Sequence, residues 1–220
     1  MTGAVKSILT LGGIGGAGSL AVGGVYFNSR ETIGNLVKDK VLGISPEFND
    51  SWKDQHKKLL SYTGELSPEL KHIKEKYINS ELSESIEALK NWCKTSYKKT
   101  YKTSLSKAQE SLLQEVTTYC IQSTKEKLQS SLTTGSGNKV LSGTGDKDEF
   151  VKNYKTLKDH DANNNGVLDS TLASWKDGAE TKADSDWSNL QKWCENHYDY
   201  PFKGVTDLFK NLRKYCTKTS

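Results

Sequence analysis

The sequence predicts an all-α protein, in which an N-terminal transmembrane helix precedes two related small helical modules. Three observations predict this class. An uncharged segment lies near the start of the chain, at residues 7–29. Apolar residues farther along recur every three or four positions, the period of an amphipathic helix. A pattern of aromatic residues followed by cysteine then occurs twice in the same order.

Residues 1–29 are predicted to form a transmembrane anchor or an uncleaved signal. Residues 7–29 contain no charged side chain and are flanked by Lys6 and Arg30. A helix of roughly 20 residues spans a bilayer, and no small-residue cleavage site follows the apolar stretch. The lipid bilayer is therefore the first predicted partner.

The glycines of this segment favour a membrane helix over a nucleotide site. Gly13, Gly15 and Gly18 match G-x-G-x-x-G, but no βαβ pattern follows them, as a dinucleotide site requires. Small residues four positions apart instead let a second transmembrane helix approach closely. The alternative is an anchor with no helix partner. The residues predicted to contact the second helix are Gly12, Gly16, Gly15, Ser19 and Gly23.

The orientation of the anchor is left open by the charges around it. Lys6 precedes the span, whereas Arg30, Lys38 and Lys40 follow it. Positive charges tend to stay in the cytoplasm, which favours a cytoplasmic body, yet large domains often cross the membrane regardless of such charges.

The body is interpreted as two copies of one module joined by a linker. "LKNWCK" (89–94) matches "LQKWCE" (190–195), and "TTYC" (117–120) matches "RKYC" (213–216). Such internal similarity indicates duplication. The predicted organisation is a juxtamembrane segment at 30–47, repeat 1 at 48–130, a Gly/Ser/Thr-rich linker at 131–149 and repeat 2 at 150–220.

Helices are expected throughout both copies, and no useful β-alternation is present. In the first copy, apolar residues at helical spacing (leucines, Ile86 and Val116) lead to Cys93 and to Cys120. In the second copy one apolar stripe runs over residues 202–216, and a helix is expected to begin at Pro201.

The chain contains four cysteines, none spaced C-x-x-C: Cys93, Cys120, Cys194 and Cys216. If the chain turns at Tyr200–Pro201, a following helix carries Cys216 roughly 20 Å beyond that turn. A disulfide needs Cα atoms about 4.4–6.8 Å apart, so a bridge to Cys194 requires a longer turn or steeply crossing helices. Disulfides and buried free thiols both stay open.

The segment "DANNNGVLD" (161–169) fits the first nine positions of an EF-hand loop. Position 12, where a bidentate Glu belongs, is Leu172, and only two of the candidate ligands are carboxylates, so any Ca²⁺ site is expected to be weak. The alternative is a helix–turn–helix in which Gly64 and Gly166 end one helix in the left-handed conformation. Ser67 and Asp169 then begin the next helix. The predicted metal ligands are Asp161, Asn163, Asn165 and Asp169.

No catalytic constellation is recognised, so the chain is not expected to be an enzyme. The histidines are scattered, and neither H-E-x-x-H nor G-x-S-x-G occurs. Ca²⁺ is the one cofactor that the sequence suggests. The net charge is +4, with both signs interleaved, so no nucleic-acid partner is expected. The densest basic run, residues 94–102, is interpreted as a solvated helix end.

The leader "KSILTLGGIGGAGSLAVGG" and the "NWC", "KWC" and "KYC" motifs, set in a Lys/Ser/Thr/Asn-rich body, resemble lineage-specific paralogous families of haemotropic mycoplasmas. These are families of uncharacterised membrane-anchored proteins. The resemblance implies a surface-exposed product of a wall-less parasite of red cells, with a host-cell surface as its partner. It implies no activity.

The leading hypothesis is a single-pass protein of the cell membrane whose extracellular body is an interaction or antigenic surface without catalytic activity. One alternative is a cytoplasmic-facing, membrane-tethered helical scaffold. The other is a weak calcium-binding module.

Overall fold

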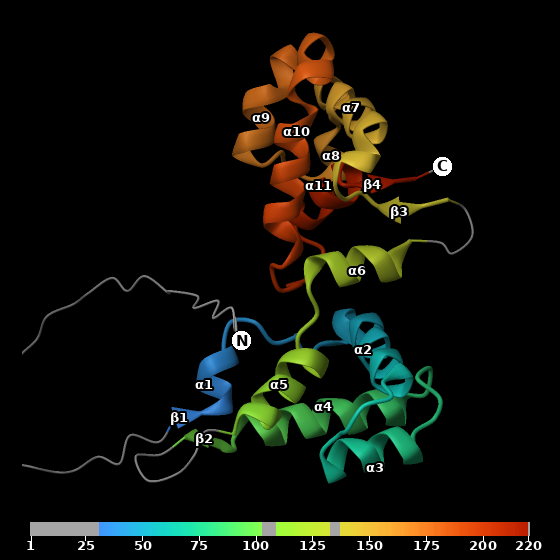
Figure 1. Ribbon diagram of the computed structural model, residues 1–220, viewed down its shortest axis with the longest axis vertical. Helices are drawn as coiled ribbons and strands as arrows, with labels where there is room; N and C mark the ends of the chain where they lie inside the picture. Colours follow the sequence, from blue (N-terminus) through green and yellow to red (C-terminus); the bar gives the residue numbers. More distant parts are fainter. Residues whose placement is uncertain (1–30, 103–108, 133–136, 220) are drawn as a thin grey trace, which may run out of the picture.

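The protein is built from two helical lobes joined by a connecting helix (Figure 1). The computed structural model describes residues 31–102, 109–132 and 137–219. We call residues 31–121 the N-lobe and residues 137–219 the C-lobe. The helical content of both lobes confirms the all-α class. The predicted anchor lies outside the described residues, and within them no helix has the length and apolar character to cross a bilayer.

The N-lobe packs its helices around a core of aliphatic side chains with no exposed surface, among them Leu59, Leu70, Leu89 and Val116. Within a helix the buried residues recur at helical spacing, as Ile86, Leu89 and Cys93 do, so the helix presents one apolar face to the others. Its elements are β1 (Glu31–Thr32), α1 (Ile33–Val37), η1 (Pro46–Phe48), α2 (Asn49–Ser61), α3 (Pro68–Lys76), α4 (Ser83–Tyr97), β2 (Thr100–Lys102) and α5 (Glu110–Tyr119).

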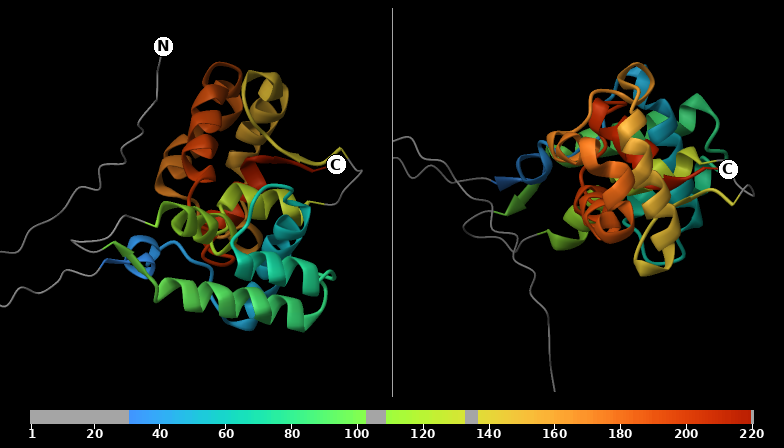
Figure 2. Two further views of the ribbon diagram at one scale, coloured as in Figure 1. Left: turned by 60° about the horizontal axis from the view of Figure 1, so that its bottom comes forward. Right: turned by 90° about the horizontal axis from the view of Figure 1, so that it is seen from above.

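In the C-lobe the longest helix, α10, lies alongside α7 (Figures 1 and 2). Phe150, Leu157 and Leu190 are fully buried there. The elements are β3 (Lys139–Val140), η2 (Thr144–Asp146), α7 (Lys147–Lys155), η3 (Thr156–Asp159), α8 (Ala162–Asn165), α9 (Ser170–Trp175), η4 (Lys176–Gly178), α10 (Ala179–Tyr198), α11 (Asp207–Tyr215) and β4 (Thr217–Lys218).

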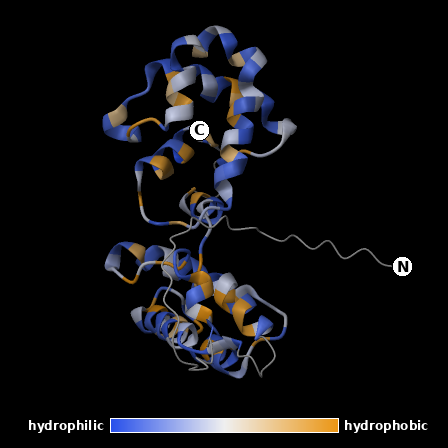
Figure 3. Ribbon diagram, turned by 90° about the vertical axis from the view of Figure 1, so that its left-hand side faces the viewer, coloured by the Kyte–Doolittle hydropathy of each residue, from blue (hydrophilic) through white to orange (hydrophobic). Residues whose placement is uncertain are grey.

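Each lobe contains one short antiparallel strand pair that was not expected from the sequence: the N-lobe pair joins its start to the segment after α4, and the C-lobe pair joins its two ends. Strand β1 pairs with β2, and β3 pairs with β4 through Lys139 opposite Lys218 and Val140 opposite Thr217. Strands of two or three residues have no readable alternation. Hydropathy along the ribbon shows hydrophobic residues interspersed with hydrophilic ones on the helices of both lobes (Figure 3).

The buried core reaches past the predicted repeat boundaries. Ile33, Val37 and Leu42 are at most 3% exposed, although they lie in the segment interpreted as juxtamembrane. Leu141 has no exposed surface, although it lies in the segment interpreted as a linker. Both segments therefore contribute side chains to the folded lobes.

Helix α11 begins at Asp207, so the predicted start at Pro201 is wrong. The Thr206 hydroxyl accepts a hydrogen bond from the Phe209 N–H at 3.3 Å and caps the helix. Gly204 has a φ of +99°, a conformation that a helix does not contain. Pro201 instead forms an isolated antiparallel bridge with Ser123.

Each lobe contains one disulfide. Cys93 bonds to Cys120 in the N-lobe, with Cα atoms 5.8 Å apart. Cys194 bonds to Cys216 in the C-lobe, with Cα atoms 5.7 Å apart. The second bridge forms within the helix pair that the sequence analysis considered strained. It is possible because residues 199–206 form a long turn before α11, so Cys216 lies only about 14 Å along the helix from its start.

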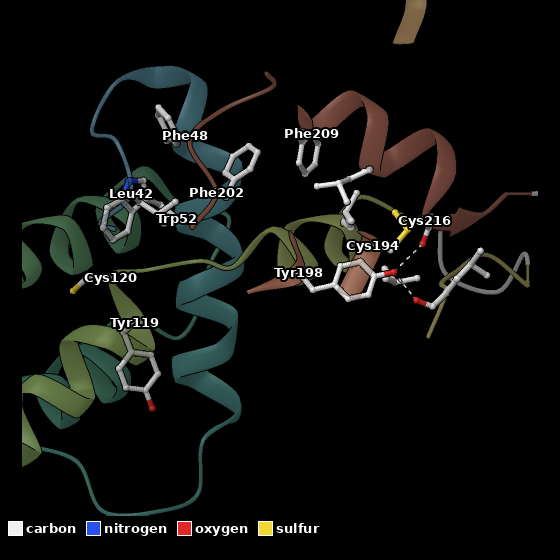
Figure 4. Packing of buried hydrophobic residues seen from close by; sticks show 14 of the residues in the cluster. Leu42, Phe48, Trp52, Tyr119, Cys120, Cys194, Tyr198, Phe202, Phe209 and Cys216 are labelled. Atoms are coloured by element: carbon white, nitrogen blue, oxygen red, sulfur yellow. Dashed lines mark hydrogen bonds between the residues drawn. A yellow bond between two sulfur atoms is a disulfide. The ribbon is translucent and has the colours of Figure 1, made fainter. Parts of the chain in front are cut away.

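The lobes meet where the turn 199–206 of the C-lobe packs on the N-lobe (Figure 4). Phe202 lies between Phe48 and Phe209, with ring centroids 6.0 Å and 4.9 Å away. Its N–H donates to the Gln122 carbonyl at 2.8 Å. Helix α6 (Thr124–Ser131) adds polar contacts to α2, because the Ser130 hydroxyl donates to Asp54 at 2.6 Å.

Candidate functional site

The residues of the predicted calcium loop lie at the ends of α8 and α9. Asp161 begins α8, and its carboxylate accepts hydrogen bonds from the Asn163 N–H at 2.9 Å and from the Asn164 side-chain amide at 2.5 Å. These bonds, first that from the Asn163 backbone, lower the pKa of Asp161. Its oxygens thus cap a helix rather than converge with those of Asp169.

Asp169 begins α9 and links it to α10. Its carboxylate accepts from the Thr171 N–H at 2.9 Å and from the Trp193 indole N–H at 3.1 Å. Burial opposes ionisation of this carboxyl, but the hydrogen bonds outweigh it and lower the pKa of Asp169. The geometry therefore agrees with the helix–turn–helix alternative for this position.

A backbone carbonyl of the loop also has a hydrogen-bond partner elsewhere in the lobe. The Asn165 carbonyl accepts from the Asn211 amide at 2.8 Å, while the Asn163 side chain is exposed. Across the described ranges no group of three or more His, Cys, Asp and Glu side chains is arranged to hold a metal ion. Calcium binding stays a prediction, which calorimetry at millimolar Ca²⁺ tests.

The two glycines expected to be left-handed differ. Gly166 has a φ of +74°, and an added Cβ would lie 2.8 Å from the Asp207 Cα, so the start of α11 excludes a side chain. Gly64 has no positive φ, and that prediction is wrong. An added Cβ there would lie 2.4 Å from the Tyr62 hydroxyl, so Gly64 makes room for the Tyr62 ring.

His160 joins the loop to α11. Its Nε2 lies 2.7 Å from the Gly166 carbonyl, and its Nδ1 lies 2.6 Å from the Tyr215 hydroxyl. Because a carbonyl only accepts, Nε2 donates to Gly166, and in the neutral ring Nδ1 accepts from Tyr215. Burial raises the pKa of Tyr215, which keeps its phenol protonated. Both nitrogens are thus committed to structural hydrogen bonds.

His56 lies in the N-lobe core with no exposed surface. Neither ring nitrogen has a hydrogen-bond partner, so no neighbouring group makes it a general base. Burial lowers the pKa of His56. It is consequently a candidate determinant of stability rather than of catalysis.

We expect the free energy of unfolding to fall as the pH drops below about 6.5, the ordinary pKa of histidine. The lowered pKa means that the unfolded chain binds a proton at His56 that the folded chain does not bind, and this costs up to about 1.4 kcal/mol per pH unit. Urea titrations at about pH 7.5 and about pH 5.5 measure the loss. His56→Leu should reduce this loss, whereas His72→Gln, at an exposed position, should leave it unchanged. An equal pH dependence in both variants contradicts the assignment.

A cavity of about 550 Å³ lies where α7, α8, α11 and β4 meet in the C-lobe. This volume is in the range of small-molecule sites. Its lining contains basic and neutral polar side chains but no His or Cys. The lining residues are Glu149, Lys152, Asn153, Thr156, Asn164, Asn165, Val205, Phe209, Lys210, Arg213, Lys214, Thr217 and Thr219.

The sequence did not predict this cavity, although the spacing of some of its basic residues indicates part of it. Lys210, Arg213 and Lys214 are spaced i, i+3, i+4, so a helix places them on one face. Lys152 comes from α7, and only the tertiary structure brings it to the same cavity. Comparisons with protein-family models, curated proteins and solved structures find no match to this chain.

Proposed function

We propose that this chain is a single-pass membrane-anchored protein whose two related helical lobes lie outside the cell and bind a partner there, without catalytic activity. The single observation that carries the proposal is the disulfide in each lobe. Disulfides persist in oxidising compartments and are rare in the cytoplasm. A body with both bridges formed therefore favours the extracellular side.

The non-catalytic part of the proposal rests on how the titratable side chains are used. His160 and Asp169 hold secondary-structure elements together, and His56 is isolated in the core. Acid–base catalysis needs a group within hydrogen-bond reach of a substrate proton. The resemblance to mycoplasma surface families supports a host-cell surface as the partner.

Matched contacts support the proposal that the two lobes are related. The Leu42 N–H donates to the Cys120 carbonyl at 3.0 Å, and the Leu141 N–H donates to the Cys216 carbonyl at 2.9 Å. At the start of α3 and of α9, the Ser67 and Asp169 N–H groups donate to side chains five positions before the second cysteine. Those acceptors are Glu115, at 2.5 Å, and Asn211, at 2.8 Å.

One difference between the lobes gives a test of this relation. In the C-lobe the Trp193 indole N–H donates to Asp169. In the N-lobe the corresponding Trp92 indole nitrogen and the Ser67 hydroxyl have no hydrogen-bond partner. We expect Ser67→Asp with Glu115→Asn to add about 1–2 kcal/mol to the free energy of unfolding, because the C-lobe arrangement satisfies the indole and caps the helix. Urea titration measures the change.

Glu115→Asn alone is the matched control for that substitution, and it should give no such gain. A double variant no more stable than the single one argues against equivalent positions in the two lobes.

The orientation is tested by protease accessibility combined with thiol counting. On intact cells, added protease should digest the C-lobe, and alkylation without reductant should modify none of the four cysteines. A C-lobe protected until lysis, with all four thiols alkylated at once, overturns the proposal and supports the cytoplasmic scaffold. The exposed lysines Lys38 and Lys40 after the span favour that second candidate.

A further inference from the structure

The C-lobe cavity gathers positive charge from two helices. Lys152 comes from α7, while Lys210, Arg213 and Lys214 come from α11. Glu149 is the one carboxylate of the lining, and it is already paired, 2.7 Å from the Lys218 amine and 3.9 Å from that of Lys152. The cavity wall therefore carries an excess of cations.

Three of these cations lack partners in the described part of the chain. The side chains of Lys210, Arg213 and Lys214 form no ion pair or hydrogen bond there. Lys155 and Lys158, on neighbouring elements of the same lobe, pair with carboxylates. Like charges at i, i+4 destabilise a helix by about 0.2–0.5 kcal/mol. Arg213 and Lys214 lie in the last turn of α11, and Lys152 lies in the last turn of α7, where a helix dipole favours a cation, but Lys210 has no such gain.

The fold does not require this charge. Counted back from the second cysteine of each disulfide, Lys210, Arg213 and Lys214 correspond to Gln114, Thr117 and Thr118 of α5. A pocket of about 140 Å³ on that part of the N-lobe is lined by Gln114 and Thr118 and contains no Lys or Arg. The three matching positions of α5 are thus uncharged, and the charged residues that line the N-lobe pocket, Glu65 and Glu115, are acidic.

The rest of the lining offers hydrogen-bonding groups. Thr156, Asn164, Asn165 and Thr219 bring hydroxyl and amide groups to the wall. The Thr156 hydroxyl and the Asn164 amide nitrogen already donate to Asn153 and Asp161, so their oxygens are the groups that can accept from the hydroxyls of a sugar. Arg213 supplies a planar guanidinium, which binds oxyanions through two parallel hydrogen bonds. Cations and neutral polar groups together match a ligand that carries both oxyanions and hydroxyls.

We propose that the C-lobe cavity binds an anionic sugar, one whose charge lies on phosphate or sulfate esters. Arg213 and Lys210 hold the oxyanion on the α11 side, and Lys152 faces it from α7. The site is independent of which side of the membrane the body faces, so it goes beyond the proposed function.

Isothermal titration calorimetry on the full chain in detergent tests the site, with fructose 1,6-bisphosphate and a trisulfated heparin disaccharide as probes. We expect heat of binding with at least one probe, and the active probe identifies the ester as phosphate or sulfate. Fructose, which is uncharged, should give none. Added salt should weaken binding, because salt screens exposed charges.

The variant Lys210→Gln/Arg213→Gln should weaken binding by about tenfold or more, because a hydrogen bond to a charged group contributes about that much. Lys94→Gln/Lys98→Gln removes the same charge from exposed positions on the N-lobe and should leave the affinity within about twofold of the unmodified chain. The affinity of Lys152→Gln tests independently whether the α7 side of the cavity contributes to binding. Circular dichroism verifies that each variant folds.

The proposal is overturned if neither probe binds. It is equally overturned if the α11 and N-lobe double variants lose affinity to the same extent, because binding then follows net charge and not the cavity.

Discussion

Replacing Phe202 with Ala is expected to lower the free energy of unfolding by about 3–5 kcal/mol, the range for removing a buried phenylalanine ring. The ring is 2% exposed and packs edge-on against Phe48 of the N-lobe and Phe209 of the C-lobe. Such aromatic pairs add to the energy of burial. Because the ring contacts both lobes, its loss should also uncouple their unfolding.

Urea titration of the full chain, followed by tryptophan fluorescence and by hydrogen exchange, measures both effects. We expect one cooperative transition in the unmodified chain and two in Phe202→Ala, since each lobe has a core of its own. Val205→Ala is the control from the same turn: Val205 is 67% exposed, and its truncation should cost less than about 0.5 kcal/mol. A Phe202→Ala variant as stable as this control would show that the turn does not join the lobes.

Removing either disulfide is the second large effect. The bridges close loops with sequence separations of 27 and 22 residues. Closing such a loop restricts the unfolded chain, so we expect Cys93→Ala/Cys120→Ala or Cys194→Ala/Cys216→Ala to cost about 2–4 kcal/mol. The N-lobe variant should lose amide protection first in residues 31–121, and the C-lobe variant first in residues 137–219.

Hydrogen exchange with mass spectrometry locates these losses, and each double variant serves as the control for the other. Adding reductant to the unmodified chain should reproduce both losses together. If reductant changes neither the exchange pattern nor the urea midpoint, the bridges are not formed in the native protein. The proposal that the body lies outside the cell would then lose its support.

Most helices were predictable, because their apolar residues recur with the helical period. Ile86, Leu89 and Cys93 mark the buried face of α4, and Phe209 and Leu212 mark that of α11. The start of α11 was not predictable from that stripe. Phe202 continues the apolar pattern, yet it packs from a turn against Phe48, and an apolar residue looks the same whether a helix or a turn buries it.

The candidate sites were also predictable only in part. The sequence pointed to Asp161 and Asp169 as ligands, and the structure uses both as helix caps, since the same carboxylate suits either role. Ser67 and Asp169 were correctly placed at helix starts, but only the Asp169 side chain caps its helix. Lys152 joins Lys210 and Arg213 only through the packing of α7 on α11, a contact between residues far apart in the chain.

The sequence by itself determined the helical class and the matching order of aromatic and cysteine residues in the two halves, because apolar periodicity and repeated short motifs are local properties of a chain. The tertiary structure alone decided which cysteines pair, how Phe202 joins the lobes and where basic residues converge on one cavity. These features depend on the three-dimensional approach of distant segments. The length of the turn 199–206 and the packing of α11 on α7 control that approach.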